Sequence, residues 1–387
     1  MATQHGYFLI ADITGYTQYL SESELDHAQQ ILTALLNLLI QNTKPPLIIS
    51  RLAGDAVISY GLGESFVQGQ TFVETLETTY VAFRRATEQM VRNTTCPCAA
   101  CQNIGSLDLK FFVHFGAFAI QKLDAHDELV GSDVNLIHRL LKNHVAEKTG
   151  LKAYALYSDA AVRQLGVDVA TEGFIQLEES YEHLGAVTVW IQDMHQVWEK
   201  RKKAAQISIT PDRELFQVST EIALPPPVVW DYIAQPDHFN VLAGGTSMEI
   251  TGRKGNRVEV GSVYECYHGD SVVHQVIVEW HPFDTIVAKY AMPIPLKGAF
   301  GFMELRLEPT ATGTRFTQIF GKSTGPLAAR VMGDVLFKMM FGGKAQADLD
   351  RFKDHVEADH GRKDIPVAAA ISNESVNAAA LESLRVA

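Results

Sequence analysis

The sequence predicts an α+β protein of two domains, and three observations carry this prediction. Strand-like and helix-like segments alternate up to about residue 195, which indicates a mixed sheet covered by helices. A charged segment, Glu199 to Ala205, then interrupts the pattern. After it, a run of strand-like segments leads into one long amphipathic segment, as expected for a curved antiparallel sheet wrapped around a C-terminal helix.

Composition limits the classes of protein to consider. The chain has 387 residues, 47% of them hydrophobic, which is enough for two cores. Its formal net charge of −12 gives no electrostatic reason to expect nucleic acid or an anionic membrane as a partner. No segment approaches the ~20 apolar residues of a membrane span. The first apolar run stops at Asp12 without a basic region before it, so we expect no signal peptide and a cytoplasmic location.

In the first domain, the apolar run Phe8 to Ala11 predicts a buried strand that carries Asp12 at its end. Gly15 then turns the chain toward a helix, and Ser21 and Glu24 have the spacing of a capping box for the next helix. That helix has apolar residues at helical spacing: Ile31, Leu32, Leu35, Leu36 and Leu39. The pattern predicts a strand followed by two helical segments.

A second acid lies at a predicted turn. The apolar runs Leu47 to Ile49 and Ala56 to Ser59 flank Gly54 and Asp55, which predicts a hairpin with the acid at its turn. The remaining elements expected in this domain are a helix at 65–93, a strand at 109–120 and strand-like alternation at 172–192.

Residues 131–142 predict a helix on which Asn135 and Arg139, four apart, share one face. Two acids with an amide and a guanidinium suit phosphate chemistry: the acids would hold metal ions on a triphosphate, and the arginine would stabilise charge at the transferred phosphorus. Each residue also has a simpler interpretation. The acids fit turn or cap positions, Arg139 fits a solvated helix charge, and His138 fits a packed or surface histidine.

Taken together and in this order, the three segments resemble the class III nucleotidyl cyclases, the catalytic domain of adenylate and guanylate cyclases. That family carries Asp-(Ile/Leu)-x-Gly-(Phe/Tyr)-Thr, then x-x-Gly-Asp in a hairpin, then Val-Asn-x-x-x-Arg. The corresponding segments here are Asp12 to Thr17, Gly54-Asp55 and Val134 to Arg139. The resemblance covers roughly residues 5–195.

The resemblance implies a ferredoxin-like cyclase fold that converts a nucleoside triphosphate to a 3′,5′-cyclic nucleotide and pyrophosphate. Asp12 and Asp55 would bind two Mg²⁺ or Mn²⁺ ions, and Asn135 and Arg139 would orient the ribose and stabilise the transition state. Phosphate binding is expected at Gly15, Tyr16 and Thr17. In the family, the metal acids come from one domain and the Asn and Arg from another, so a single catalytic domain implies a homodimer.

The positions that select the base depart from the family pattern. Arg51 stands four residues before Asp55, where adenylate cyclases carry Lys. Glu128 stands seven before Asn135, where they usually carry Asp or Thr. Guanylate cyclases carry Glu and Cys at these positions, which is a poorer match. A donor at 51 and an acceptor at 128 keep the polarity that adenine needs, which favours ATP, although cytosine would also satisfy the pair.

Three of the four cysteines, Cys96, Cys98 and Cys101, form one cluster. In a cytosolic chain such clustering favours metal binding over disulfides. Three thiolates would hold a structural Zn²⁺ with a fourth ligand from a His, an acid or a second chain. A redox role and plain reduced thiols are the alternatives. The cluster also resembles that of an uncharacterised bacterial branch of the cyclase superfamily.

In the second domain, Pro225 to Pro236 predicts a short helix after a strand, and the last helix is expected from Gly325 to Val356. The segment that ends at Asn240, with Val-Trp-Asp-Tyr-Ile-Ala-x-Pro-Asp-His-Phe-Asn, resembles the START-like superfamily (SRPBCC), which includes polyketide cyclase and lipid-transfer branches. The resemblance implies a helix-grip fold that holds a small hydrophobic ligand in a cavity.

Candidates to line the cavity, or equally to fill the core, are Trp230, Phe239, Tyr290, Met292, Phe300, Phe302, Met339 and Met340. No spacing among His268, His274 and Glu279 implies a catalytic pair, so no catalysis is predicted in this domain.

The predicted organisation is a cyclase-like domain at 1–198, a linker at 199–209, a START-like ligand-binding domain at 210–358 and a flexible tail at 359–387. In the first functional hypothesis, the chain is a nucleotidyl cyclase regulated by a hydrophobic ligand. In the alternative, it is a catalytically inactive cyclase-fold scaffold whose function is hydrophobic ligand or lipid binding. An aromatase-like or hydrolytic activity of the second domain would need a polar pair in the cavity.

Overall fold

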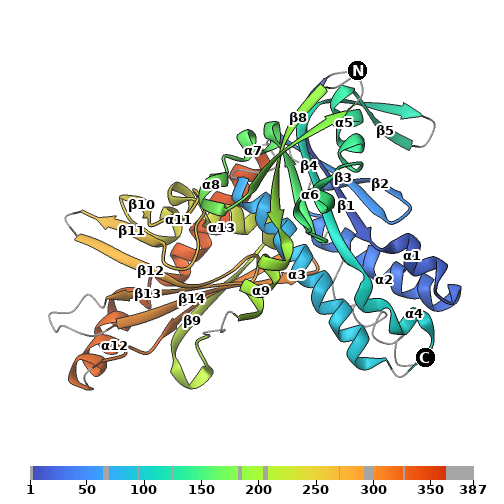
Figure 1. Cartoon of the computed structure of the whole chain (residues 1–387). Helices are drawn as coiled ribbons and strands as arrows, with labels where there is room; N and C mark the ends of the chain where they lie inside the picture. The colour runs from blue at the N-terminus through green and yellow to red at the C-terminus, as the bar shows by residue number, and fades with distance from the viewer. Residues whose placement is uncertain are drawn as a thin grey trace. The chain divides into compact units, whose positions relative to one another are not determined.

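The computed structural model divides the chain into two compact units at residues 204–205, and each unit is described by itself (Figure 1). The division falls within the charged segment, whose first part, Glu199 to Lys203, is the end of helix α9 (Met194–Lys203). The structure describes residues 3–63, 69–94, 96–123, 126–181, 185–203, 208–269, 271–291, 300–325 and 327–362. None of the described helices is long and apolar enough to cross a membrane.

The first unit is built on one mixed sheet. Its strands are β1 (Gln4–Thr14), β2 (Ile48–Ala53), β3 (Ala56–Leu62), β4 (Asp108–Leu123), β5 (His126–Val130), β6 (Tyr154–Ser158), β7 (Ile175–Tyr181) and β8 (Gly185–Asp193). They are ordered β2-β3-β1-β4-β6-β8-β7, with β5 paired to β4. Neighbouring strands are antiparallel except β4 and β6, which are parallel.

Helices lie on both faces of this sheet, so β1 is buried on both sides. Leu9 and Ala11 of β1 join the core formed with α2 and α3, whereas Phe8 and Ile10 join the core formed with α5. The helices are α1 (Tyr16–Ser21), α2 (Leu25–Thr43), α3 (Gly69–Asn93), α4 (Ala99–Gln102), α5 (Ser132–Leu140), α6 (Val145–Thr149), α7 (Asp159–Leu165), α8 (Val169–Glu172) and α9, with a 3₁₀ turn at Ile104–Ser106.

The predicted capping box is wrong. Ser21 ends α1, and its hydroxyl donates to the backbone oxygen of Gln18 at 2.9 Å. Glu24 occupies the N-cap position of α2 but forms no side-chain cap there. Its carboxylate instead accepts a hydrogen bond from the backbone N–H of Ala100, 3.1 Å away. Glu24 therefore binds a backbone group 76 positions later in the chain, and not the start of its own helix.

The second unit is built on an antiparallel sheet ordered β10-β11-β12-β13-β14-β15-β9. The strands are β9 (Glu214–Ile222), β10 (Ser247–Thr251), β11 (Val263–His268), β12 (Ser271–His281), β13 (Thr285–Ala291), β14 (Phe300–Thr310) and β15 (Gly313–Gly321). A 3₁₀ turn (Pro211–Arg213) precedes β9, and α10 (Pro226–Ile233) and α11 (Pro236–Ala243) connect β9 to β10. The last helix, α13 (Ala345–Arg362), contributes the fully buried Leu349, Phe352 and Val356 to the core. The predicted α+β class is confirmed for both units.

The single helix expected from Gly325 to Val356 is two helices, α12 (Leu327–Phe341) and α13, separated by Gly342, Gly343 and Lys344. Glycine disfavours a continuous helix, which accounts for the break. Within α12, Phe337 is buried, whereas Met339 and Met340 are 77% and 51% exposed. Met339, two positions after the inward Phe337, points to the opposite side of the helix. The side chain of Met340 is exposed as well, so the prediction that these methionines line a cavity is wrong. Helix α13 also continues four residues beyond the predicted domain end at 358.

Candidate functional site

The two acidic residues of the cyclase-like pattern lie at one end of the sheet. Asp12 is near the end of β1, where it pairs with Ala56 of β3 on one side and Lys110 of β4 on the other. Asp55 lies in the turn between β2 and β3. The backbone N–H of Ile13 donates to the backbone oxygen of Asp55 at 3.2 Å, which ties the strand end to that turn. Strand pairing therefore brings together two acids that are 43 positions apart.

The environment of both carboxyl groups opposes their ionisation. Burial raises the pKa of Asp12 to about 6, with a contribution from the negative charge of Asp55, while Lys110 acts in the opposite direction. Burial also raises the pKa of Asp55. Two half-buried carboxylates that repel each other are stabilised by a shared cation, and carboxylate oxygens are the ligands that Mg²⁺ prefers.

The turn after Asp12 requires a glycine. Gly15 has φ +88°, a conformation that residues with a side chain rarely adopt, and its backbone oxygen accepts from the N–H of Tyr19 at 2.9 Å. Tyr16 is half-buried against the core, and Thr17 is exposed. The hydroxyl oxygen of Thr14 is buried and has no hydrogen-bond partner among the described residues. A buried polar atom without a partner is uncommon in folded proteins, and this one lies two residues from Asp12.

The two positions predicted to contact the base form an ion pair. Arg51 Nη1 of β2 lies 2.5 Å from Glu128 Oε2 of β5. His138 of α5 joins them, with its Nε2 3.5 Å from Arg51 Nη2. Burial, followed by the positive charge of Arg51, lowers the pKa of His138. The sequence analysis interpreted His138 as a packed or surface residue. Its position three residues after Asn135, on the same predicted helix, was the sequence feature that could have indicated a place near the site.

Asn135 and Arg139 lie on the exposed side of α5, while Val134, Ile137 and Leu140 form its buried side. Neither Asn135 nor Arg139 forms a side-chain hydrogen bond or ion pair with the described part of the chain, so neither is joined to the acid pair. The helix itself is anchored, because its residue Asp133 accepts the backbone N–H of Ala117 at 2.7 Å. The helix thus presents an amide and a guanidinium, both available to a ligand.

The residues predicted to line a cavity in the second unit are divided by the structure. Trp230, Phe239 and Tyr290 are buried in the core, where Trp230 packs edge-on against Trp280 with ring centroids 4.6 Å apart. Phe300 is 38% exposed, Phe302 is half-buried, and Met292 lies outside the described residues.

The second unit also buries polar groups, among them Glu279, Glu304 and Gln318. The hydroxyl of Tyr290 is buried without a hydrogen-bond partner among the described residues, and it marks a polar point inside the core. Glu279 pairs with His281 at 2.9 Å, whereas His274 lies 3.7 Å from Glu265 and His268 lies 3.1 Å from the sulfur of Cys266.

The three clustered cysteines meet a histidine that the sequence did not single out. Cys96, Cys98 and Cys101 lie beside His27 of α2, and all four cysteines of the chain are free thiols. His27 is 69 positions before Cys96, so no local spacing links it to the cluster.

Comparison with known families divides the chain in the same way. Residues 213–357 match the family described as polyketide cyclase / dehydrase and lipid transport. Residues 32–149 match a family of proteins of unknown function, DUF2652. An uncharacterized protein of Mycobacterium tuberculosis (strain ATCC 25618 / H37Rv) is 36% identical over 104 residues, which are 26% of this chain and 49% of that protein. The chain thus spans about half the length of the curated relative it matches.

The solved structures similar to this chain include guanylyl and adenylyl cyclases, each covering about half of it. The guanylyl cyclase Cya2 is 14% identical, covers 49% of this chain and 92% of its own, and has a TM-score of 0.38. The adenylyl cyclase CyaB from P. aeruginosa is 15% identical over 50% of this chain and 97% of its own, with a TM-score of 0.37. The two resemblances predicted from the sequence, to class III cyclases and to START-like proteins, are those that the comparisons return.

Proposed function

We propose that the first unit is a nucleotidyl cyclase that converts a nucleoside triphosphate into a 3′,5′-cyclic nucleotide and pyrophosphate. The observation that carries the proposal is the contact between the end of β1 and the β2–β3 turn, which places Asp12 and Asp55 together with raised pKa values. Paired acids whose ionisation is opposed by their surroundings are typical of functional sites rather than of turns.

The residues around the acid pair fit divalent cations. Asp12 and Asp55 supply hard oxygen ligands, and the unpartnered hydroxyl of Thr14 is close to them in sequence. Bound Mg²⁺ or Mn²⁺ would neutralise the triphosphate and favour ionisation of the 3′-hydroxyl. Attack of this oxygen on the α-phosphorus forms the P–O bond of the cyclic product and breaks the bond to the β-phosphate oxygen, which leaves as pyrophosphate. Gly15, Tyr16 and Thr17 remain candidates for holding the phosphates.

A homodimer completes the proposed site. Arg139 would donate to the phosphoryl oxygens where charge accumulates, and Asn135 would hold the ribose. Both side chains are exposed and have no described partner within their own chain. A second copy that presents its α5 to the acid pair would therefore supply the missing cation, as the predicted resemblance implies.

Base selection is proposed to depend on the Arg51–Glu128 ion pair. Arg51 would donate to the ring nitrogen of adenine and Glu128 would accept from its exocyclic amine, so ATP is the favoured substrate. His138, beside Arg51, would help to position that guanidinium. Glu128→Gln keeps the shape of the acceptor and adds a donor, and it is expected to reduce discrimination between ATP and the other triphosphates.

The deciding experiment is a turnover assay of the full chain with Mg²⁺ or Mn²⁺ and each of the four ribonucleoside triphosphates. Cyclic product and pyrophosphate are followed for the wild type, Asp55→Asn and Arg139→Ala, with the exposed Arg163→Ala as the control. Mixing the two inactive variants is expected to restore part of the activity, because one of the two sites of a mixed dimer keeps all of its residues. A folded wild-type chain that yields no cyclic product from any triphosphate would refute the proposal.

A second candidate function rests on the family match of residues 213–357, described as polyketide cyclase / dehydrase and lipid transport. In this candidate the second unit binds a small hydrophobic ligand next to the unpartnered Tyr290 hydroxyl. Titration with a fluorescent fatty-acid analogue, compared between wild type and Tyr290→Phe, tests it. Binding by a chain without cyclase turnover would identify a ligand-binding scaffold, whereas binding that changes turnover would identify a regulator. No binding would contradict the candidate.

A further inference from the structure

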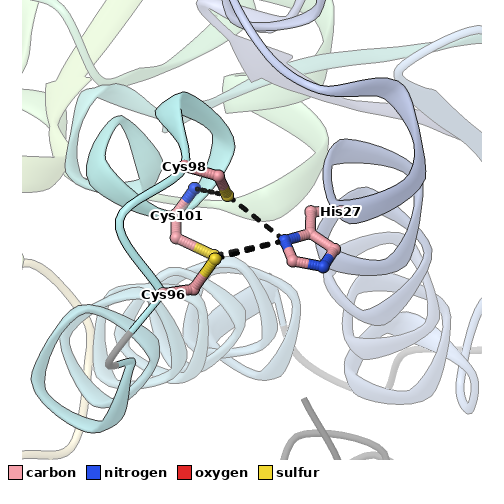
Figure 2. A group of neighbouring side chains, drawn as sticks. All are labelled: His27, Cys96, Cys98 and Cys101. Atoms are coloured by element: carbon pink, nitrogen blue, oxygen red, sulfur yellow. Dashed lines mark hydrogen bonds between the residues drawn. The ribbon is translucent and has the colours of Figure 1, made fainter.

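Four side chains with metal-binding atoms meet where the connection from α3 to β4 packs against α2 (Figure 2). Cys96 and Cys98 lie in the loop after α3, Cys101 lies in α4, and His27 lies near the start of α2. Figure 2 shows the imidazole of His27 directed from its helix toward the sulfur atoms. Cys101 is buried and the other three are half-buried.

The distances fit ligands of one tetrahedral ion. Nδ1 of His27 lies 3.2 Å from the sulfur of Cys98, 3.6 Å from that of Cys96 and 3.8 Å from that of Cys101. All four ligand atoms lie within 4.8 Å of one another. Bonds of about 2.3 Å to sulfur and about 2.0 Å to nitrogen place neighbouring tetrahedral ligands about 3.5–3.8 Å apart. The observed nitrogen–sulfur distances lie around that value.

Hydrogen bonds from outside the four residues hold the cysteine loop in place. The backbone of Ala100 is bound on both sides, because its N–H donates to the Glu24 carboxylate at 3.1 Å and its oxygen accepts from the Tyr19 hydroxyl at 2.9 Å. Within the four residues, the sulfur of Cys98 accepts the backbone N–H of Cys101 at 3.5 Å. Such supporting contacts orient ligands before an ion arrives.

We propose that Cys96, Cys98, Cys101 and His27 bind one Zn²⁺ ion as a closed structural site. Three sulfur ligands and one imidazole fill the four positions that tetrahedral zinc requires, and a site without an open position holds structure rather than activating water. The ion would link α2 to the α3–β4 connection. In this peripheral region, the metal bonds would hold the two segments together where few buried side chains do so. This inference is independent of whether the acid pair is catalytic.

The first test measures metal in the full chain purified under reducing conditions without added metal. We expect one zinc per chain by plasma mass spectrometry, and replacement by Co²⁺ is expected to give sulfur-to-cobalt charge-transfer bands together with tetrahedral d–d bands. Cys98→Ser and His27→Ala are expected to lower the zinc content, whereas Cys266→Ser, which removes the cysteine of the second unit, leaves it unchanged.

A variant that still has four metal ligands separates loss of zinc from loss of the fold. His27→Cys supplies a fourth thiolate and is expected to retain zinc while shifting the cobalt spectrum. Thiol titration of native wild-type protein can contradict the proposal. The assignment would be overturned if the chains are metal-free and the three clustered thiols all react at the rate of exposed cysteines. A disulfide found among these thiols by mass spectrometry would overturn it as well. Zinc that remains bound at the wild-type level in His27→Ala and Cys98→Ser would do so as well.

Discussion

Replacement of Asp12 by Asn is expected to stabilise the metal-free fold while it abolishes the proposed catalysis. The pKa of Asp12 rises from 3.8 to about 6, mainly through burial. A shift of about 2 pH units corresponds to about 3 kcal/mol of ionisation cost in the native state at neutral pH. The Asn amide removes this cost but is itself desolvated, at about 1–2 kcal/mol. The expected net gain is therefore about 1–2 kcal/mol, or about 3–6 °C in Tm for a unit of this size.

The raised pKa of Asp12 also makes the stability of the wild type depend on pH. Between pH 3.8 and about 6 the native state binds more protons than the unfolded state, so this residue lowers wild-type stability as pH rises through that interval. Asp12→Asn lacks the effect. Its advantage over the wild type is expected to be about 1–2 kcal/mol at pH 7 and close to zero at pH 5. Below pH 4 the variant is expected to be less stable than the wild type by about 1–2 kcal/mol, because only the desolvation of the amide remains.

The assay is thermal unfolding at pH 7.5 and pH 5 in buffer free of divalent cations and of chelators, followed by titration with Mg²⁺. The exposed Asp26→Asn is the matched control and is expected to change stability by less than about 0.5 kcal/mol. Mg²⁺ is expected to raise the Tm of the wild type and leave Asp12→Asn unchanged. A variant that is less stable than the wild type at pH 7.5, or that responds equally to Mg²⁺, would refute the reasoning.

Two further predictions concern the folding of each unit. Gly15→Ala forces a side chain into φ +88°, with the backbone oxygen of Ser106 3.3 Å from the new carbon. It is expected to lower the free energy of unfolding by about 1–2 kcal/mol, measured by thermal unfolding. Gly105→Ala has no such constraint and is the control that is expected to be nearly neutral. Phe352→Ala empties a fully buried position and is expected to cost about 3–5 kcal/mol in urea unfolding of the second unit. The 38%-exposed Phe300→Ala is expected to cost far less, and equal losses would contradict this account of the core.

Local patterns predicted the elements that carry the candidate site. The apolar run from Phe8 to Ala11 is a buried strand, and the Gly54-Asp55 segment is the turn of a hairpin. The helix at α5 presents Asn135 and Arg139 on one side because their spacing of four is close to one helical turn. These features depend on the period of the backbone and on nearest neighbours, so a short stretch of sequence is enough to specify them.

Contacts between distant segments were outside the reach of such patterns. His27 reaches the cysteine cluster from 69 positions before Cys96, and His138 joins Arg51 across 87 positions. Met339 was misplaced for a related reason: its apolar character predicts burial, but only the orientation of α12, fixed by Phe337, decides which side of that helix meets the core.

Sequence patterns were enough to predict the two-domain α+β organisation, the strand and turn that carry Asp12 and Asp55, and the types of side chain offered to a phosphate and to a metal ion. Three contacts became visible only in the folded chain: Glu128 pairs with Arg51, Glu24 binds the cysteine loop, and the imidazole of His27 lies beside three thiols. The physical reason is that backbone periodicity acts over a few residues, whereas charge pairing and metal ligation depend on distances of a few ångströms between segments that only the packed sheets and helices bring together.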